Sequence, residues 1–254
     1  MQTIIRYTLI TALRDWLFIG LVMLVAAAYG MSVFTGSTAL VEQAHMSIAY
    51  FAGSSRIVLM VGLIVFVCFH VRRLFDNREI ESMLSKPISR GQFVVAYWFG
   101  FVILAVIATV PVVIIMETIY TPNHMGLLYW VSSLLLELAL VLAFAVVAAL
   151  MLSSAVSAVM ASFAFYFVSR LMGFFVAALA QPSGLESGVA SRIMAMILKA
   201  ISSIVPRLDL YAKSNWLIYG IEGQMDLWIF QIQSVVFIAL LLAMAVFDFK
   251  RKQF

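Results

Sequence analysis

The chain has 254 residues, of which 65% are hydrophobic and only 11% are charged. An ordinary globular domain is about half apolar and a quarter charged, so this chain has too few polar residues to cover a water-soluble fold. The composition therefore excludes a soluble protein and predicts an all-α polytopic membrane protein in contact with the lipid bilayer. The net charge of +4 does not indicate nucleic-acid binding, because the basic clusters flank apolar runs. The single cysteine, Cys68, excludes an internal disulfide and multi-cysteine zinc motifs.

Apolar runs long enough to cross a bilayer, about 20 residues each, occur six times in the chain. They cover residues 16–35, 54–72, 92–118, 128–152, 155–180 and 228–248. The stretch from 129 to 180 would be roughly 75 Å long as one helix, so it must fold back, and small hydroxyl residues place the turn near Ser153–Ser157. We treat residues 1–254 as one transmembrane domain.

The distribution of basic residues predicts the orientation of the six spans. The short segments on the side of both termini hold ten Lys and Arg residues, whereas the opposite short loops hold only Arg56. The ten are Arg6, Arg14, Arg72, Arg73, Arg78, Lys86, Arg90, Lys250, Arg251 and Lys252. By the positive-inside rule both termini are expected in the cytoplasm, in a membrane that we expect to be the bacterial inner (plasma) membrane.

Two segments outside the spans have the helical periodicity of interfacial structure. Ile5, Leu9 and Ala12 recur at helical spacing ahead of the first span, which predicts an amphipathic elbow helix lying in the headgroup plane. Residues 192–205 are amphipathic but too short to cross, and they predict an external interfacial helix before the sixth span, ended by Pro206. A re-entrant hairpin is the alternative for this external segment.

A charged segment between the second and third spans, residues 72–92, has strong helix boundary signals. Asp76 with Glu79 three residues later predicts a helix start, and Pro87 predicts its end. Ser89 with Gln92 forms a second capping-box pattern at the start of the third span. The sequence therefore predicts a short, rigid cytoplasmic helix held between two spans.

The run Glu79–Phe93, with Gly100 after it, resembles the loop between spans two and three in permease subunits of ABC exporters of the ABC-2 type, also called type V. The shared features are an acidic helix, a leucine–serine pair, Pro-Ile-Ser-Arg and an early glycine in the next span. The chain looks most like the short six-span permeases, such as those of nitrous-oxide reductase maturation systems. In that family this loop is the coupling helix, which docks on a nucleotide-binding subunit.

The resemblance implies the function, the partners and a contact site. The chain would be the permease subunit of an ATP-driven exporter, paired with a second permease copy, as a homodimer, and with two ABC ATPase subunits. The residues in or beside the ATPase contact would be Asp76, Arg78, Glu79, Glu81, Leu84, Pro87 and Arg90. ATP and Mg would bind the partner ATPase and no cofactor would bind this chain, since Gly-Lys, which the ATP-binding P-loop motif requires, occurs nowhere in it. The chain is therefore not expected to be an enzyme by itself.

Three carboxylate and guanidinium groups fall within or beside the predicted spans. Glu137 in the fourth span and Arg170 in the fifth are at similar predicted depth, so we expect an ion pair between them. The pair would either brace the two spans or line the substrate path. Glu117 is expected at the outer rim beside Tyr120, within reach of water. We expect no metal site, because Cys68 and His70 are two residues apart and point to different sides of a helix.

Two other classes of function stay open from the sequence. An intramembrane enzyme would need a nucleophile with a nearby base, but His45 and His124 fall in outer loops. An ATP-independent transporter or channel would commonly show inverted repeats with broken helices, which are absent here. For an exporter, the scarcity of polar groups in the spans favours a lipid-like, amphipathic or peptide cargo over a small ion.

Overall fold

The computed structural model describes residues 2–38, 42–77, 89–120, 122–180, 196–197, 205–220 and 225–251. Over these residues the fold is all-α, and no strand occurs in them. The elements are, in chain order, α1 (Gln2–Leu13), α2 (Trp16–Thr38), α3 (Gln43–Asp76), α5 (Arg90–Ile115), η1 (Met116–Tyr120), α6 (His124–Met151), α7 (Ala155–Ala180), η2 (Leu208–Leu210), α9 (Asn215–Tyr219) and α10 (Met225–Arg251).

Six helices are long and apolar enough to cross a membrane, which agrees with the predicted count. They are α2, α3, α5 with its η1 extension, α6, α7 and α10. The turn predicted near Ser153 is confirmed, because α6 ends at Met151 and α7 begins at Ala155. The predicted capping box is also confirmed: Ser89 Oγ accepts from the Gln92 backbone N–H at 3.2 Å, and Gln92 Oε1 accepts from the Ser89 N–H at 3.3 Å.

The second span differs most from its predicted bounds. The predicted range begins at residue 54, but α3 begins at Gln43 and includes a polar first turn. The apolar run is recognised only from residue 54 because Gln43, His45 and Ser47 lower the mean hydropathy of the preceding residues. A helix can nevertheless extend beyond the hydrocarbon core of the membrane. As a result Arg56, which was counted with the opposite short loops at the very start of the predicted span, lies well inside α3.

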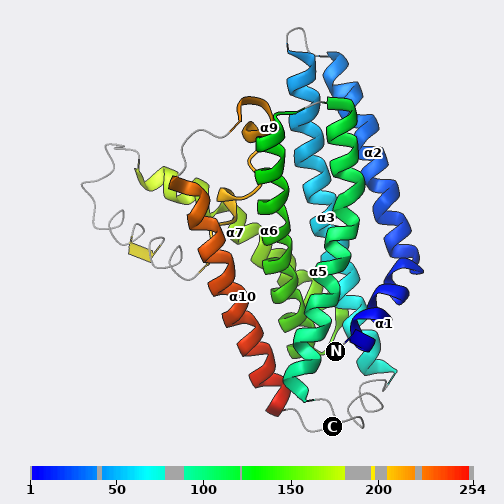
Figure 1. Cartoon of the computed structure of the whole chain (residues 1–254). Coiled ribbons are helices and arrows are strands. Elements are labelled where there is room, and N and C mark those ends of the chain that lie inside the picture. The colour runs from blue at the N-terminus through cyan, green and yellow to red at the C-terminus, as the bar shows by residue number, and fades with distance from the viewer. Residues whose placement is uncertain are drawn as a thin grey trace.

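The helices run up and down between two ends of one bundle (Figure 1). We call the end with both chain termini the terminal end; it also holds the end of α3, the start of α5 and the α6–α7 turn. The opposite end, with the end of α2, the start of α3, η1, the start of α6 and residues 205–220, is the distal end. The structure has no membrane in it, so which end faces the cytoplasm stays a prediction.

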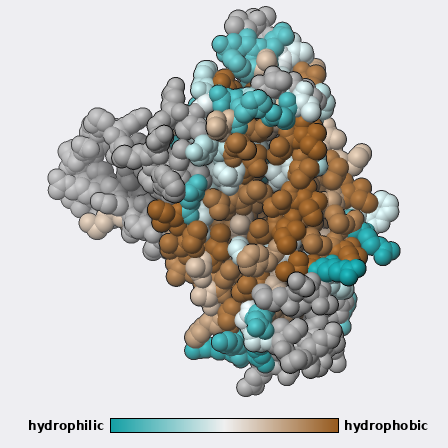
Figure 2. Space-filling model, viewed as in Figure 1, coloured by the Kyte–Doolittle hydropathy of each residue, from teal (hydrophilic) through white to brown (hydrophobic). Residues whose placement is uncertain are grey.

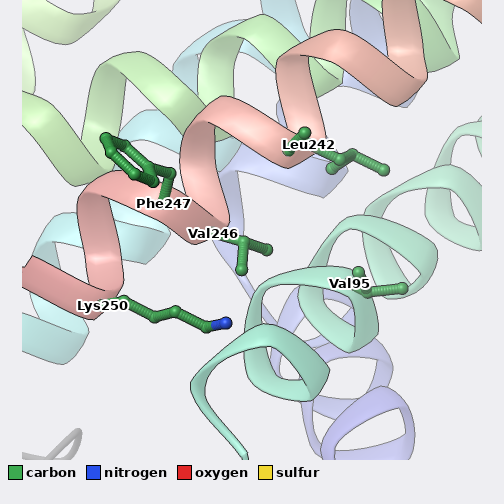
Figure 3. Close-up of a pocket in the computed structure, with 6 residues that line it drawn as sticks. Val95, Leu242, Val246, Phe247 and Lys250 are labelled. Atoms are coloured by element: carbon green, nitrogen blue, oxygen red, sulfur yellow. The ribbon is translucent and has the colours of Figure 1, made fainter.

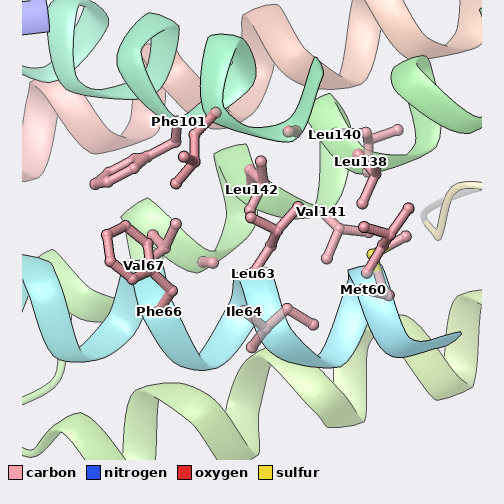
Figure 4. Close-up of a cluster of buried hydrophobic side chains, with 14 of the residues drawn as sticks. Met60, Leu63, Ile64, Phe66, Val67, Phe101, Leu138, Leu140, Val141 and Leu142 are labelled. Carbon is pink, nitrogen blue, oxygen red and sulfur yellow. The ribbon is translucent and has the colours of Figure 1, made fainter. Parts of the chain in front are cut away.

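Helix α6 is the centre of the bundle. It packs against α3, α5, α7, α9 and α10, and it buries side chains on all sides along most of its length. Figure 4 shows one of these contacts, in which Leu63, Phe66 and Val67 of α3 meet Leu142 of α6 and Phe101 of α5. A helix that is apolar all round fits a fully enclosed position.

The outer surface of the bundle is a broad apolar band. Figure 2 shows it as a brown region with hydrophilic residues above and below on the visible face. Large side chains such as Phe34 of α2, Phe174 of α7 and Leu240 of α10 are more than half exposed. An exposed apolar surface of this extent suits contact with lipid chains and not with water.

The N-terminal helix α1 packs against α5. The buried Thr8 of α1 faces Gly100 of α5, where a Cβ would lie 3.3 Å from the Thr8 Cβ. A two-residue turn then leads into α2, and Asp15 Oδ1 accepts a hydrogen bond from the Leu17 N–H at 3.0 Å, which caps the new helix. The expected position of α1 in the headgroup plane stays a prediction.

Candidate functional sites at the two ends of the bundle

The end of α3 is tied to two other turns at the terminal end. Arg72 Nη2 lies 3.2 Å from Asp76 Oδ1, and its Nη1 donates to the Leu152 carbonyl at 3.4 Å, in the α6–α7 turn. Arg73 Nη1 lies 3.6 Å from Asp15 Oδ2, in the α1–α2 turn. The last turn of α3 is thus bound to both neighbouring turns by guanidinium groups.

The start of α5 is tied to the end of α10. Arg90 Nη1 donates to the carbonyl oxygens of Phe249 at 3.2 Å and Lys250 at 3.1 Å. These are carbonyls of the last helical turn, which lack partners within the helix and carry the negative end of its dipole. The Phe249 ring stacks on Phe93 of α5 at a centroid distance of 5.5 Å and meets Phe75 of α3 edge-on at 6.5 Å. Polar and aromatic contacts therefore join α3, α5 and α10.

The predicted ATPase-contact residues divide between described and undescribed parts of the chain. Asp76 is the last residue of α3 and Arg90 the first of α5, so the two flank residues 77–89. Arg78, Glu79, Glu81, Leu84 and Pro87, and with them the expected coupling helix, lie outside the described residues. The structure thus places the two flanks of the segment and the contacts that hold them.

At the distal side, Glu137 and Arg170 lie together inside the bundle. Arg170 Nη1 is 3.6 Å from Glu137 Oε1, with the Glu137 side chain fully buried and that of Arg170 25% exposed. Among the described residues neither carboxylate oxygen of Glu137 accepts a hydrogen bond. A buried charge needs compensation from nearby opposite charges, and two cations act on Glu137, those of Arg170 and Arg56.

Both arginines hold a segment that the sequence analysis placed outside the spans. Arg170 Nη1 donates to the carbonyls of Leu208 and, at 3.2 Å, of Tyr211, and Arg56 Nη1 donates to that of Ala212 at 3.1 Å. Residues 205–220 therefore enter the bundle. The re-entrant hairpin, which was the alternative for residues 192–205, stays a prediction. The interfacial helix expected at 192–205 lies outside the described residues, apart from Met196, Ile197 and Val205.

Ala212 is held in a rarely occupied backbone conformation. Its φ of 46° is in the left-handed region, which costs free energy for a residue with a Cβ. Its N–H donates to Ser133 Oγ of α6 at 3.0 Å, while its carbonyl accepts from Arg56 of α3. Both backbone groups are therefore fixed by helices of the bundle, which keeps this turn in place.

Tyr211 anchors the same segment on its other side. Its hydroxyl is 2.8 Å from Ser234 Oγ of α10, and the side chain is fully buried. Burial raises the pKa of Tyr211 to about 12, with the charge of Glu137 adding to the rise and the Ser234 hydrogen bond opposing it. The phenol thus keeps its proton at any physiological pH.

Two glycines let segment 205–220 approach the helices closely. A Cβ on Gly126 of α6 would collide with the Trp216 carbonyl, and a Cβ on Gly173 of α7 would collide with the Asp209 carboxylate. Arg56, Ser133 and these glycines were missed by the sequence reasoning. The available signal was a glycine within an otherwise bulky apolar span, which often marks close backbone approach.

Glu117, expected at the outer rim, lies in η1 at the distal end. Its Oε1 is 2.8 Å from His124 Nδ1 at the start of α6, and its side chain is 42% exposed. Close by, the Tyr120 hydroxyl is 2.6 Å from Ser32 Oγ of α2. These contacts tie η1 to α6 and α2.

No protein-family model matches the chain, and no curated protein matches it.

Proposed function

We propose that this chain is the permease subunit of an ATP-binding cassette exporter of the ABC-2 type, driven by a separate ATPase subunit that grips residues 76–90. The proposal starts from the resemblance of Glu79–Phe93 to the coupling loop of that family. The observation that carries it furthest is the bracing of both flanks of that segment, at Asp76 and Arg90.

The bracing matters because a force applied to a flexible loop would be lost in local motion. Here the flank at Asp76 is bound through Arg72 and Arg73 to the α6–α7 and α1–α2 turns. The flank at Arg90 is bound to the end of α10. A displacement of residues 76–90 would therefore move several helices together, since packed elements shift as units.

The assembly that follows has two permease copies and two ATPase subunits, with both termini in the cytoplasm of a bacterial inner membrane. Each permease would contribute one half of a translocation path at a two-fold axis. ATP and Mg would be held by the ATPase, so the chain itself supplies no catalytic residue. The cargo proposed is lipid-like, amphipathic or peptidic and moves outward.

Segment 205–212 is the part of the distal end that we assign to gating. Its carbonyl oxygens accept hydrogen bonds from Arg56 and Arg170, while the Glu137 carboxylate lies 3.6 Å from Arg170 as a second possible acceptor. If Arg170 turned from the carbonyls to Glu137, the segment would lose one of its anchors and the carboxylate would gain a hydrogen bond. Arg170 would then hold segment 205–212 in one state, as a brace, and would release it by pairing more closely with Glu137 in the other, as a latch.

The proposal is tested by copurification and by charge reversal in the contact. The full chain is purified in mild detergent from its own cells, and an ATPase subunit of about equal amount should accompany it. Glu79→Lys with Glu81→Lys should lower that recovery about tenfold or more, because like charges facing a partner oppose binding. The control reverses two acidic residues at the distal end, Glu42→Lys with Glu117→Lys, and should keep the partner.

Different outcomes separate the three classes of function. Loss of transport with an intact thermal unfolding profile in the Glu79/Glu81 variant supports the docking role. Equal ATPase recovery from both double variants would overturn it. Hydrolytic activity or ion conduction by the purified chain alone would favour the intramembrane enzyme or the ATP-independent transporter instead.

A further inference from the structure

An apolar groove runs along the surface between α5 and α10 toward the terminal end. It has a volume of about 440 Å³ and is lined by Val95 of α5 and by Leu242, Ala243, Val246, Phe247 and Lys250 of α10. Figure 3 shows Val95 across the gap from Leu242 and Val246, with the Lys250 amine directed to the same gap. The groove opens on the side of the bundle that carries the apolar band.

Small residues lie in and beside the groove. Gly91 at the start of α5 faces Val246, since a Cβ at Gly91 would be in ordinary contact with Val246 Cγ1 at 3.4 Å. Ala243, one turn before Val246 on α10, lines the groove with a short side chain. In a membrane a gap of this kind must be filled, because empty apolar space forfeits dispersion contacts.

The residues of α10 that face the groove change from apolar to charged along the helix. Leu242, Val246 and Lys250 are spaced four residues apart and so lie on one face, with the apolar residues first and the cation last. The distance along the helix from Leu242 to Lys250 is about 12 Å, close to the half-thickness of roughly 15 Å of a hydrocarbon core. This order of apolar length and terminal positive charge matches one acyl chain followed by a phosphate.

Positive charge collects where the groove reaches the terminal end. The Arg90 guanidinium is fixed beside Lys250 by its bond to the Lys250 carbonyl at 3.1 Å, and Arg251 lies over the Phe247 ring at 4.1 Å. Among the residues that the structure describes, no carboxylate lines the groove. Asp248, two residues before Lys250, points about 160° away from it round the helix. A zwitterionic headgroup would leave these cations without a net counter-charge.

We propose that this groove binds one anionic glycerophospholipid, with an acyl chain along Val95, Leu242 and Val246 and the phosphate at Lys250. Basic pockets between transmembrane helices at a membrane surface are suited to anionic headgroups. The bound lipid would cover the α5–α10 seam next to the Arg90 contact and stabilise it. The inference does not depend on the proposed export function, because it concerns only the lipid-facing surface of one chain.

The test uses the full chain, delipidated in a neutral detergent and titrated with phosphatidylglycerol or with phosphatidylcholine of identical acyl chains. Bound lipid is counted by native mass spectrometry. Phosphatidylglycerol should bind at least fivefold more tightly. Lys250→Gln should reduce that preference about fivefold, the factor expected for one basic residue near an anionic surface, and Lys250→Arg should retain it.

Two matched variants locate the site. Arg6→Gln removes one exposed charge at the same end, away from the groove, and should leave the preference unchanged. Ala243→Phe fills the groove without changing charge and should weaken the binding of both lipids. Thermal unfolding profiles of all variants check that the fold is retained.

Three results would overturn the proposal. Equal affinity for the two lipids would mean that the groove holds ordinary bilayer lipid. An effect of Arg6→Gln equal to that of Lys250→Gln would mean that the preference follows overall charge. Loss of a dimer in Ala243→Phe with unchanged lipid binding would mean that a second copy of the chain occupies the groove.

Discussion

Arginine residues organise both ends of the bundle, but in different surroundings. At the terminal end each ion pair has one side chain more than half exposed: Arg73 is 56% exposed against Asp15 at 16%, and Asp76 is 67% exposed against Arg72 at 17%. At the distal side Arg170 is 25% exposed and its partner Glu137 is fully buried. Water can replace the partner of an exposed guanidinium, whereas a buried one depends on the protein for every contact.

The difference shows how similar contacts can serve different roles. Each terminal ion pair has one exposed member that water or a partner protein can reach, so each pair is expected to be individually weak. The distal contacts pin an inserted segment to the middle of the bundle, so each is expected to be energetically large. We therefore expect mutations to separate the two ends by their effect on stability.

The largest expected effect is at Glu137 and Arg170. Glu137→Leu leaves Arg56 and Arg170 without their carboxylate, and Arg170→Leu leaves a buried carboxylate with one fewer cation. Each single variant should lower the free energy of unfolding by about 3–5 kcal/mol. The double variant should lose clearly less than the sum, because it removes both members of the pair and leaves only Arg56 without its carboxylate. Denaturant titrations in detergent micelles measure all three.

The exposed pair at the distal rim provides the control for that experiment. Glu117→Leu removes a carboxylate from a 2.8 Å contact with His124 that water can reach, and it should cost no more than about 1 kcal/mol. Costs that simply add in the Glu137/Arg170 double variant would show that the two residues act independently. The brace and latch described above would then both be wrong.

An intermediate effect is expected at Arg90, where Arg90→Gln removes a charged donor from two carbonyls of α10. The loss should be about 1–2 kcal/mol, lower than for a fully buried charged hydrogen bond because the site is partly exposed. Hydrogen exchange should become faster in the last turn of α10, and Arg6→Gln should leave it unchanged. Unaltered exchange in Arg90→Gln would mean that Arg90 does not hold the end of α10.

The smallest effect is expected at Asp15 and Arg73. Asp15→Asn removes the charge but keeps a side-chain acceptor for the Leu17 N–H, so it should cost about 0.5 kcal/mol or less. Asp15→Ala also removes the helix cap and should cost about 1 kcal/mol. Thermal unfolding at low and high salt compares them. A large, salt-sensitive loss in Asp15→Asn would show that the terminal end is as tightly held as the distal one.

The span boundaries followed from the sequence where apolar and polar residues change abruptly. The range predicted for α7, 155–180, agrees with the structure, and that for α6 ends within one residue of Met151. Local signals sufficed at Ser89 and Gln92 as well, because a capping box is formed by residues three apart. The start of α3 was missed because its first turns are polar.

The distal site was only partly predictable. Glu137 and Arg170 stand out as rare charges in apolar spans. Their ion pair could be predicted because the two residues lie at a similar predicted depth in the membrane. The insertion of Leu208, Tyr211 and Ala212 beside them depends on contacts with four helices. Such contacts between residues distant in sequence leave no periodic pattern in the segment itself.

The sequence by itself determined that the chain is helical, that six helices are long and apolar enough to cross a membrane, and where most of them begin and end. Only the tertiary structure decided that α6 is central, that α2 and α10 are peripheral, and that residues 205–220 return into the bundle. The physical reason is that lipid chains and the protein interior are both apolar. A leucine that faces lipid and a leucine that faces another helix therefore have the same hydropathy signal.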